Sequence, residues 1–594
     1  MGSNLKAPPL IFPVHLDRSL ALRAAWLTAR RAGLRRVLRR LERRLRLGVM
    51  DPWLAPRFYP APAGTAAGPA LPTQLAVLRC LVALRGATPL AAAWDALTGT
   101  IALLGQPPAP LAWPASWLAS PVADPLWAFR LHSWEWAWPH LADPARRTAL
   151  LELWRDWLAR VPVGRGPAWE PHPTSQRLVV WAAAWHLLGG DATLAAAIAR
   201  QAAFLADHLE RDLDNNHLVT NAKALAWAGV LLPGLPGAPR WRRQGLELFW
   251  TTLDAQVLAD GGHDERSTGY HLAVWLDALE LALLCLASGE APPPRAWAAL
   301  ERMRVFALAL RRPDGRLPLL NDSVEDEPLP ASAIFALAEV LLGVPGHAAG
   351  RCRPVTELRD SGYAVLRAGA GPAGVYLAFD AGELGPRHFL GHGHADALSF
   401  ELWAGGEPLV LDPGTYQYPA GPWRDYFRGT AAHSTVTVDG YDQSVFAGPF
   451  RVAEAAHGRI VAVSEDAGAP TVTGEHDGYR RLASPVSHRR SVQLHGPSRL
   501  TLADQLEGAG RHALVGRLHL APCQLAIESP QLARAIYPGG SRVAYRLVGD
   551  AAAWRVEEGW TSRRWYQREP SPVLAWAVET PLPFALVTEI AIEP

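Results

Sequence analysis

The hydrophobic pattern of the chain changes its period near residue 350, and this change limits the accessible folds more than any other feature. Between about residue 70 and residue 343, apolar residues recur every three or four positions, as in LLELWRDWLARV and VWLDALELALLCLASG. That period is typical of helices, and Gly or Pro ends each run. Later runs such as GVYLAFDAG and STVTVDG are short and β-branched, as in antiparallel strands. Helices followed by strands predict separate α and β domains.

We therefore expect an α+β multidomain fold with three segments. These are a basic N-terminal helical segment at 1–50, a helical domain at 51–343, and an antiparallel β-sheet domain at 355–594. Several predicted helices are apolar nearly all round, which is expected where helical hairpins pack against neighbours on both sides in a ring. The 594 residues are enough for two or more cores. A cleft between the domains would suit a long substrate.

The basic charge of the chain is concentrated near its N-terminus. Residues 18–46 contain eleven Arg and one acidic residue, Glu42, whereas the whole chain has a net charge of +2. The spacing of Leu and Val in LRRVLRRLERRLRL predicts a helix. Two interpretations stay open: a solvated helix face, or peripheral contact of 18–46 with an anionic membrane or glycan. The remaining sequence has no pattern of a nucleic-acid-binding module, so no nucleic-acid partner is expected.

Neither a membrane span nor a signal peptide is predicted, and the localisation is left open. No charge-free run of about eighteen apolar residues occurs, and the N-terminus lacks the usual order of a charged region, an apolar region and a cleavage site. The four cysteines are widely spaced and match no metal or redox motif, so buried thiols are expected. Most of the 25 tryptophans are expected in the core.

Two polar motifs precede predicted helices. In LDNNHLVTNAKALAWAG, Asn215, Asn216 and His217 come directly before an apolar run, where either asparagine could simply cap the helix. In DGGHDERSTGYHLAVWLDALEL, a Gly-rich loop leads to Tyr270, which by itself could be an ordinary packing residue. Each motif alone is weak, but together they place polar and titratable groups at the starts of two helices.

A third set of motifs, in the predicted sheet domain, is more specific. GHGHADALSFELW contains His392 and His394, PLVLDPGTYQY contains Asp412, and YFRGTAAHSTVTVDG contains His433. Neighbouring strands can bring His394, Asp412 and His433 around one point, and two imidazoles with one carboxylate suit Zn²⁺. Separately hydrogen-bonded histidines are the simpler alternative.

The order and spacing of these five motifs resemble the heparinase II/III family and the related alginate and oligoalginate lyases, from about Trp169 to the end of the chain. The resemblance implies an incomplete (α/α) toroid followed by antiparallel β-sheets. It also implies Asn216 and His217 as carboxylate neutralisers, Tyr270 as proton donor or base, and His392 as the partner catalytic histidine. His394, Asp412 and His433 would hold a divalent metal, with Zn²⁺ in a structural role as the expected ion. Ser434 departs from the family, which often has Asn there, and this affects the surroundings of His433.

The expected function is that of a polysaccharide lyase. Such an enzyme cleaves a uronic-acid-containing acidic glycan by β-elimination and leaves a C4–C5 unsaturated uronate, either in breakdown or in the making of an exopolysaccharide. One alternative is a glycoside hydrolase on the same kind of toroid, for which Asp264 and Glu265 are the available carboxylates. The other is an inactive acidic-glycan-binding protein. The polymer, endo or exo action, and the identity of the base stay open.

Overall fold

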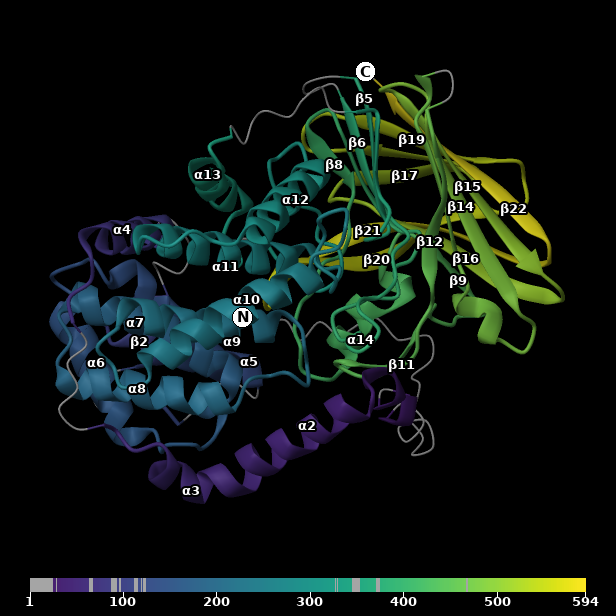
Figure 1. The fold of residues 1–594 in the computed structure, drawn as a ribbon. Helices are drawn as coiled ribbons and strands as arrows, with labels where there is room; N and C mark the ends of the chain where they lie inside the picture. The colour runs from purple at the N-terminus through teal and green to yellow at the C-terminus, as the bar shows by residue number, and fades with distance from the viewer. Residues whose placement is uncertain are drawn as a thin grey trace.

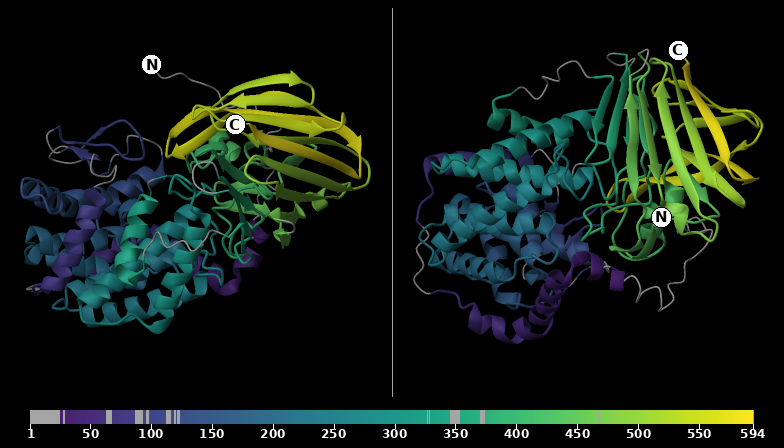
Figure 2. Two further views of the ribbon diagram at one scale, coloured as in Figure 1. Left: turned by 90° about the horizontal axis from the view of Figure 1, so that it is seen from above. Right: turned by 45° about the vertical axis from the view of Figure 1, so that its right-hand side comes forward.

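The computed structural model consists of a helical part followed by a part made of antiparallel sheets, and the two lie side by side (Figures 1 and 2). This is the order of elements that the change of hydrophobic period predicted. The structure describes residues 25–27, 29–62, 68–86, 93–95, 98–111, 116–118, 120, 124–325, 327, 329–344, 353–369, 374–465 and 468–593.

The helices of the first part begin and end where proline, glycine and capping residues stand. Several carry Pro in the first turn, where its missing N–H costs no helical hydrogen bond. Gly189 and Gly343 end α7 and α13 in the left-handed conformation that glycine adopts easily. The helices are α2 (Leu34–Leu45), α3 (Asp51–Phe58), α4 (Pro72–Gly86), α5 (Pro125–Ser133), α6 (Arg147–Arg160), α7 (Pro171–Leu188), α8 (Ala192–Asp207), α9 (Asn216–Leu231), α10 (Ala238–Gln256), α11 (Thr268–Ala287), α12 (Pro294–Leu310) and α13 (Ala331–Leu342).

The core of the helical part is rich in tryptophan, as predicted. Its largest fully buried side chains include Trp136, Trp181, Trp227 and Trp275. Helix α9 is buried on nearly all sides, and α10 packs closely on it, because a Cβ on Gly245 would lie 2.3 Å from the backbone nitrogen of Ala226. Among the described residues, α11 is the one helix long and apolar enough to span a membrane, but 67% of its apolar stretch is buried inside the protein.

The second part contains a five-stranded sheet (β4-β5-β6-β7-β8), a four-stranded sheet (β20-β21-β16-β9), an eight-stranded sheet (β12-β13-β14-β15-β22-β19-β18-β17) and the hairpin β10-β11. Side chains from the three larger sheets share one hydrophobic core. Burial alternates along β14, so one face of its sheet points into that core.

The strands of this part are β4 (Val355–Leu358), β5 (Tyr363–Ala368), β6 (Val375–Asp380), β7 (Phe400–Ala404), β8 (Glu407–Val410), β9 (Val436–Val438), β10 (Val445–Gly448), β11 (Arg451–Glu454), β12 (Gly458–Ser464), β13 (Thr471–His476), β14 (Val486–Leu494), β15 (Arg499–Gly508), β16 (Arg511–His519), β17 (Gln524–Ser529), β18 (Leu532–Ile536), β19 (Arg542–Val548), β20 (Ala553–Arg564), β21 (Gln567–Pro581) and β22 (Phe584–Glu593). Two details were not predicted. Three two-residue strands, β1 (Trp94–Asp95), β2 (Thr100–Ile101) and β3 (Ala109–Pro110), lie in the helical part, and a short helix, α14 (Pro422–Arg428), lies in the sheet part.

Helix α2, formed by the basic N-terminal segment, joins the two parts of the molecule. It runs below the other helices from α3 toward β11 (Figure 1). Just before it, Arg31 donates hydrogen bonds to the backbone oxygens of Val452 at 3.1 Å and Ala453 at 3.3 Å. Arg43 pairs with Asp212 of the helical part at 2.8 Å. The described part of this segment is therefore partly ion-paired rather than simply solvated, while residues 18–24 lie outside the described residues.

Candidate active site

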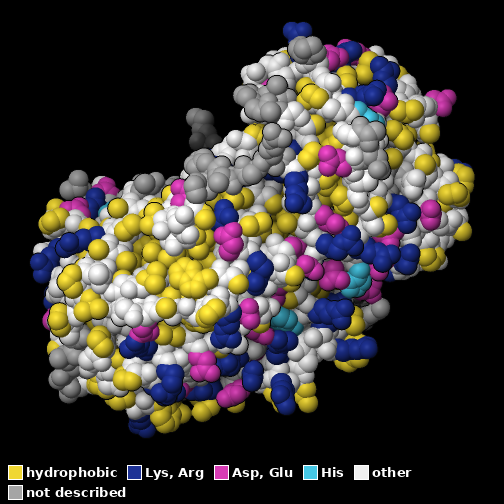
Figure 3. Space-filling view, turned by 45° about the horizontal axis from the view of Figure 1, so that its top comes forward, with side chains coloured by type: hydrophobic (Ala, Val, Ile, Leu, Met, Phe, Trp, Pro, Cys, Tyr) yellow, Lys and Arg dark blue, Asp and Glu magenta, His cyan; other side chains and the backbone are white. Residues whose placement is uncertain are grey.

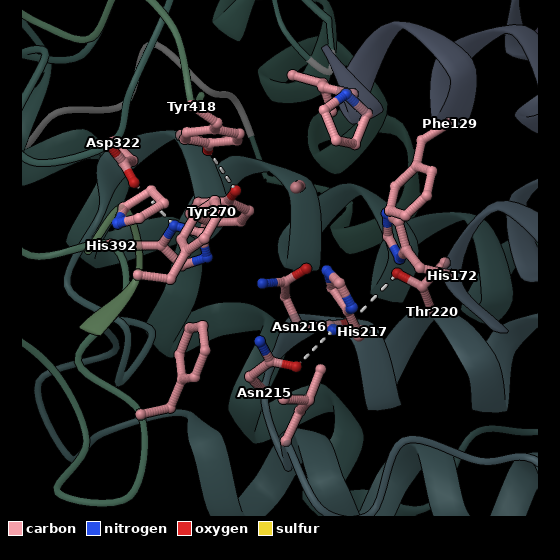
Figure 4. Close-up of a pocket in the computed structure, with 18 of the residues that line it drawn as sticks. Phe129, His172, Asn215, Asn216, His217, Thr220, Tyr270, Asp322, His392 and Tyr418 are labelled. Carbon is pink, nitrogen blue, oxygen red and sulfur yellow. Dashed lines mark hydrogen bonds and ion pairs between the residues drawn. The ribbon is translucent and has the colours of Figure 1, made fainter. Parts of the chain in front are cut away.

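A cleft with a volume of about 920 Å³ lies between the helical and sheet parts. Its walls come from α2, α5, α7, α9 and α11 on one side and from loops around residues 387–392, 418–420 and 447–452 on the other. Figure 4 shows two groups of side chains in this cleft, one around Tyr270 and His392 and one around His217, with Asn216 between them. The four predicted catalytic residues thus lie in one cavity.

The start of α9 presents Asn216 and His217 to the cleft. Asn215 is the residue that caps the helix, because its side-chain oxygen accepts a hydrogen bond from the His217 backbone N–H at 3.1 Å. Asn216 is therefore not needed as the cap. Its backbone N–H and its side-chain Nδ2 both donate to Oε1 of buried Glu265, at 2.9 and 2.7 Å. Glu265 therefore fixes the side-chain amide of Asn216, and the remaining N–H and the oxygen of that amide stay available to a ligand.

His217 carries a carboxylate partner and a second histidine that the sequence analysis did not identify. Nδ1 of His217 lies 3.1 Å from Oε1 of Glu210, and its ring stacks on His172 with 4.0 Å between centroids. Burial disfavours the protonated form of His217, but the negative charge of Glu210 outweighs it and raises the pKa above its usual value. Burial, with the neighbouring His217, holds the pKa of His172 well below its usual value. The surroundings of the stack therefore favour the protonated form of His217 and the neutral form of His172.

The start of α11 places Tyr270 in the same cleft. Ser267 caps this helix by accepting a hydrogen bond from the Tyr270 N–H at 3.2 Å. The Tyr270 hydroxyl lies 2.7 Å from the hydroxyl of Tyr418, and its ring lies 4.1 Å from that of His392. Burial and the nearby negative charge of Asp322 raise the pKa of Tyr270 far above its usual value, so its hydroxyl keeps its proton. Tyr418 belongs to the LDPGTYQY motif, but its role was not predicted.

His392 lies between two buried carboxylates. Its Nδ1 is 2.9 Å from Asp322 and its Nε2 is 3.4 Å from Glu265. Arg424 binds both oxygens of Asp322, one of them at 2.8 Å, and holds the pKa of this buried carboxyl well below its usual range. Asp322 also contacts Nε2 of His394 at 3.1 Å. This one carboxylate therefore orients both histidines of the GHGHAD motif, although nothing in its own sequence context indicated it.

The structure brings His394 and His433 together, with 5.4 Å between ring centroids. Nδ1 of His394, Nε2 of His433 and Oδ2 of Asp396 are buried without a hydrogen-bond partner among the described residues, and these residues offer ligand atoms within 4.8 Å of one another. Asp412 lies on the other side of His433, 3.1 Å from its Nδ1. Two imidazole nitrogens and a carboxylate oxygen left unsatisfied in the interior fit a divalent ion such as Zn²⁺. Asp396, the last residue of GHGHAD, was missed as a candidate ligand.

Two buried arginines, and the two carboxylates named for the hydrolase alternative, have structural contacts instead. Arg177 is fully buried and donates to Gln201 at 2.8 Å, and Arg428 donates to the backbone oxygen of Pro449 at 2.8 Å. Asp264 and Glu265 do not line the cleft as a facing pair. Burial and the charge of Glu265 raise the pKa of Asp264 to about 8. Asp264 and Glu265 therefore do not form the pair of carboxylates facing each other across a glycosidic bond that the hydrolase alternative requires.

The chain matches two family models, the heparinase II/III N-terminus at residues 114–335 and the heparinase II/III-like C-terminal domain at residues 350–578. A heparin-sulfate lyase of Bacteroides stercoris is 25% identical over 373 residues, covering 59% of this chain and 53% of that protein. The FtsZ-localized protein C of Caulobacter vibrioides is 27% identical over 462 residues, covering 71% of this chain and 74% of that protein.

Among solved structures, a crystal structure of heparinase III superposes with a TM-score of 0.70 at 18% identity, covering 90% of this chain and 87% of that one. This likeness confirms the predicted fold class of a helical toroid followed by antiparallel β-sheets. The chain spans about half the length of the heparin-sulfate lyases that it matches. Both family models together extend over the toroid and the sheets, and they include the NNH, Tyr270 and GHGHAD motifs. The chain belongs to the heparinase II/III family.

Proposed function

We propose that this protein is a polysaccharide lyase that cleaves a uronic-acid-containing acidic glycan by β-elimination. The observation that carries the proposal is the convergence of Asn216, His217, Tyr270 and His392 in one cleft (Figure 4). Elimination requires a group that neutralises the uronate carboxylate, a base for the C5 proton and an acid for the departing oxygen. The cleft contains side chains suited to each task. The similarity to proteins named heparin-sulfate lyase supports the same class of reaction.

Asn216 and His217 are the proposed partners of the substrate carboxylate. The charge of Glu210 favours the imidazolium form of His217, and an imidazolium is complementary to a carboxylate. Hydrogen bonds from both side chains would stabilise the negative charge that develops when the C5 proton leaves. Removing one such donor typically costs about 10²–10³ in rate.

Tyr270 is the proposed acid and His392 the proposed base. The raised pKa of Tyr270 keeps its hydroxyl protonated and disfavours a phenolate base. With Nδ1–H directed at Asp322, Nε2 of His392 takes the C5 proton, the C5–H electron pair forms the C4–C5 double bond, and the C4–O4 bond breaks. Tyr270 gives its proton to the departing O4. The imidazolium formed on His392 lies between Asp322 and Glu265, whose negative charges stabilise it.

The charges along the cleft favour an acidic substrate. Arg44, Arg387 and Arg451 line the cleft and form no ion pair among the described residues. The acidic side chains that line it are instead hydrogen-bonded or ion-paired within the protein, namely Asp124 with Tyr566, Glu135 and Glu327 with Arg130, Asp277 with Lys223, and Asp322 with Arg424. Within the described part of the chain, these three arginines therefore remain available to an acidic substrate. On the face drawn in Figure 3, charges of both signs are mixed, in keeping with the net charge of +2 of the chain.

A divalent ion, with Zn²⁺ as the expected one, is proposed to have a structural role. His394 and His433, with a carboxylate from Asp396 or Asp412, would hold it. When bound, it would fix the loop that carries His392, two residues before His394, rather than activate the substrate. Elemental analysis of zinc-supplemented protein should find about one ion per chain. A protein without stoichiometric metal would contradict this proposal.

The activity is tested by incubating the protein with heparan-type, alginate-type, chondroitin-type and bacterial exopolysaccharide uronates while ultraviolet absorbance is followed. A lyase produces the absorbance of a C4–C5 unsaturated uronate on at least one of these polymers, and Tyr270→Phe does not. New reducing ends without that absorbance would indicate a hydrolase. Binding of an acidic polymer without turnover, unchanged in Tyr270→Phe, would indicate an inactive glycan-binding protein.

A further inference from the structure

The leucines of α2 point away from the protein. Leu34, Leu38, Leu41 and Leu45 are spaced four, three and four residues apart, which places them on one face of the helix. Their relative exposures are 73%, 55%, 58% and 54%. A surface helix in a globular protein normally turns its apolar face toward the core. This helix has no buried residue at all, so its apolar face has no partner in the part of the chain that the structure describes.

Ion pairs on the opposite face of α2 hold it in this orientation. Arg36 pairs with Asp214, and Arg43 donates to both oxygens of Asp212, at 2.9 and 2.8 Å. Asp212 is buried, so its charge depends on these partners. Turning the leucines inward would break these pairs. The contacts between α2 and the toroid therefore fix the outward direction of the leucines.

Exposed aromatic and cationic side chains lie on α2 itself and on the next helix, α3. Trp53 and Phe58 of the next helix, α3, are 73% and 66% exposed. Arg35 and Arg39 are exposed and form no ion pair among the described residues. The guanidinium of Arg165 lies over the Trp53 ring at 5.3 Å from its centroid. Exposed leucines, large aromatic rings and unpaired arginines thus occur together on α2, α3 and the adjoining loop.

We propose that the outer face of α2 and α3 binds an anionic membrane surface. A strongly amphipathic helix that is rich in charged residues, with arginines beside its apolar face, lies in the plane of the membrane interface. α2 itself contains six Arg and one Glu. Each arginine near an anionic leaflet adds attraction, while the leucines enter the boundary between headgroups and acyl chains. This surface is separate from the proposed chemistry, because Leu38 and Leu41 do not line the cleft.

Two other occupants fit the surface less well. An acidic glycan would pair with the arginines but would offer no apolar surface to the leucines. A second copy would have to form a coiled coil over the twelve residues of α2, fewer than two heptads, whereas a coiled coil needs about three to four. An anionic membrane satisfies both the apolar and the charged side chains.

The test is sedimentation of the full-length protein with phosphatidylcholine vesicles that contain or lack phosphatidylglycerol. The wild type should bind the anionic vesicles and leave the neutral ones largely unbound. Replacing two exposed leucines in Leu38→Glu/Leu41→Glu should lower binding at least about tenfold. The matched control is Val340→Glu, which changes a 77% exposed apolar residue of α13 and should bind like the wild type.

A second variant, Arg35→Glu/Arg39→Glu, should also lower binding to anionic vesicles at least about tenfold and weaken its dependence on salt. Thermal melting verifies that each variant is folded. Turnover of a soluble oligosaccharide should be the same in Leu38→Glu/Leu41→Glu as in the wild type. A failure of the membrane proposal can therefore be told apart from a failure of the proposed lyase activity. A wild type that does not sediment, or a leucine variant that sediments equally well, overturns the proposal. Dimers in light scattering that vanish in the leucine variant, without vesicle binding, would assign the face to a second copy instead.

Discussion

Replacing Tyr270 by phenylalanine removes one hydroxyl and leaves the ring on His392. In the wild type this hydroxyl shares a hydrogen bond of 2.7 Å with Tyr418. Losing one neutral hydrogen bond costs about 0.5–1.5 kcal/mol of stability. The ring contact at 4.1 Å from His392 does not depend on the hydroxyl. Tyr270→Phe should therefore stay folded, with a melting temperature only slightly below that of the wild type.

The effect of Tyr270→Phe on turnover should be far larger than its effect on stability. Without an acid for the departing oxygen, kcat should fall by about 10²–10⁴ while KM changes little, because the carboxylate is held by Asn216 and His217. The rate is measured from the ultraviolet absorbance of the unsaturated product on the best uronate substrate. The control is Tyr418→Phe, which removes the same hydrogen bond but keeps the Tyr270 hydroxyl and should lose much less activity. If Tyr270→Phe kept more than about a tenth of wild-type turnover, Tyr270 would not be the acid.

Three further changes probe the surroundings of the site. Glu210→Gln removes the charge that raises the pKa of His217. As pH rises, the variant should therefore lose imidazolium-dependent activity at a lower pH than the wild type does. An unchanged pH profile would contradict this role. Arg387→Ala should raise KM for acidic polymers severalfold with kcat nearly constant and should weaken the salt dependence, and an equal fall in kcat would argue against a pure binding role. Arg424→Met leaves Asp322 buried without its guanidinium and should cost about 3–5 kcal/mol in denaturant unfolding, whereas a loss below about 1 kcal/mol would show that the pair is not needed.

The division into a helical and a sheet half could be predicted because hydrophobic period is a local property of the sequence. The placement of Asn216 and Tyr270 in the cleft could be expected from motifs at helix starts, where Asn215 and Ser267 supply the caps. Their proposed roles came from the resemblance to the heparinase II/III family. The short strands β1–β3 were missed, since two-residue strands carry no period to detect. Local pattern thus identified the long elements and the motif residues that they position.

The residues that support the site could not be predicted in the same way. Asp322 and Glu265 reach His392 from segments far from it in the chain, and only the tertiary fold brings them together. The same holds for Glu210 and His172 beside His217. Carboxylates in such segments look like any other polar loop residues in the sequence. Their pKa shifts arise from burial and neighbours that no single motif contains.

The orientation of helix α2 was another feature that the local sequence pattern did not predict. The spacing of its leucines predicted an amphipathic helix, but not which face it turns to the protein. That choice depends on Asp212 and Asp214, which pair with its arginines from the loop before α9. With those partners known, the leucine face is the one left exposed. A sequence-based assumption that leucines face the core would give the wrong orientation for this helix.

Cleavage of the glycosidic bond by elimination is the central claim, and the mass of the products tests it most directly. Oligosaccharides released from the best uronate polymer are separated and analysed by mass spectrometry together with ultraviolet absorbance. We expect products whose non-reducing end is lighter by one water molecule than a hydrolysis product and absorbs as a C4–C5 unsaturated uronate. Products with the full mass of hydrolysis and no such absorbance would contradict the claim.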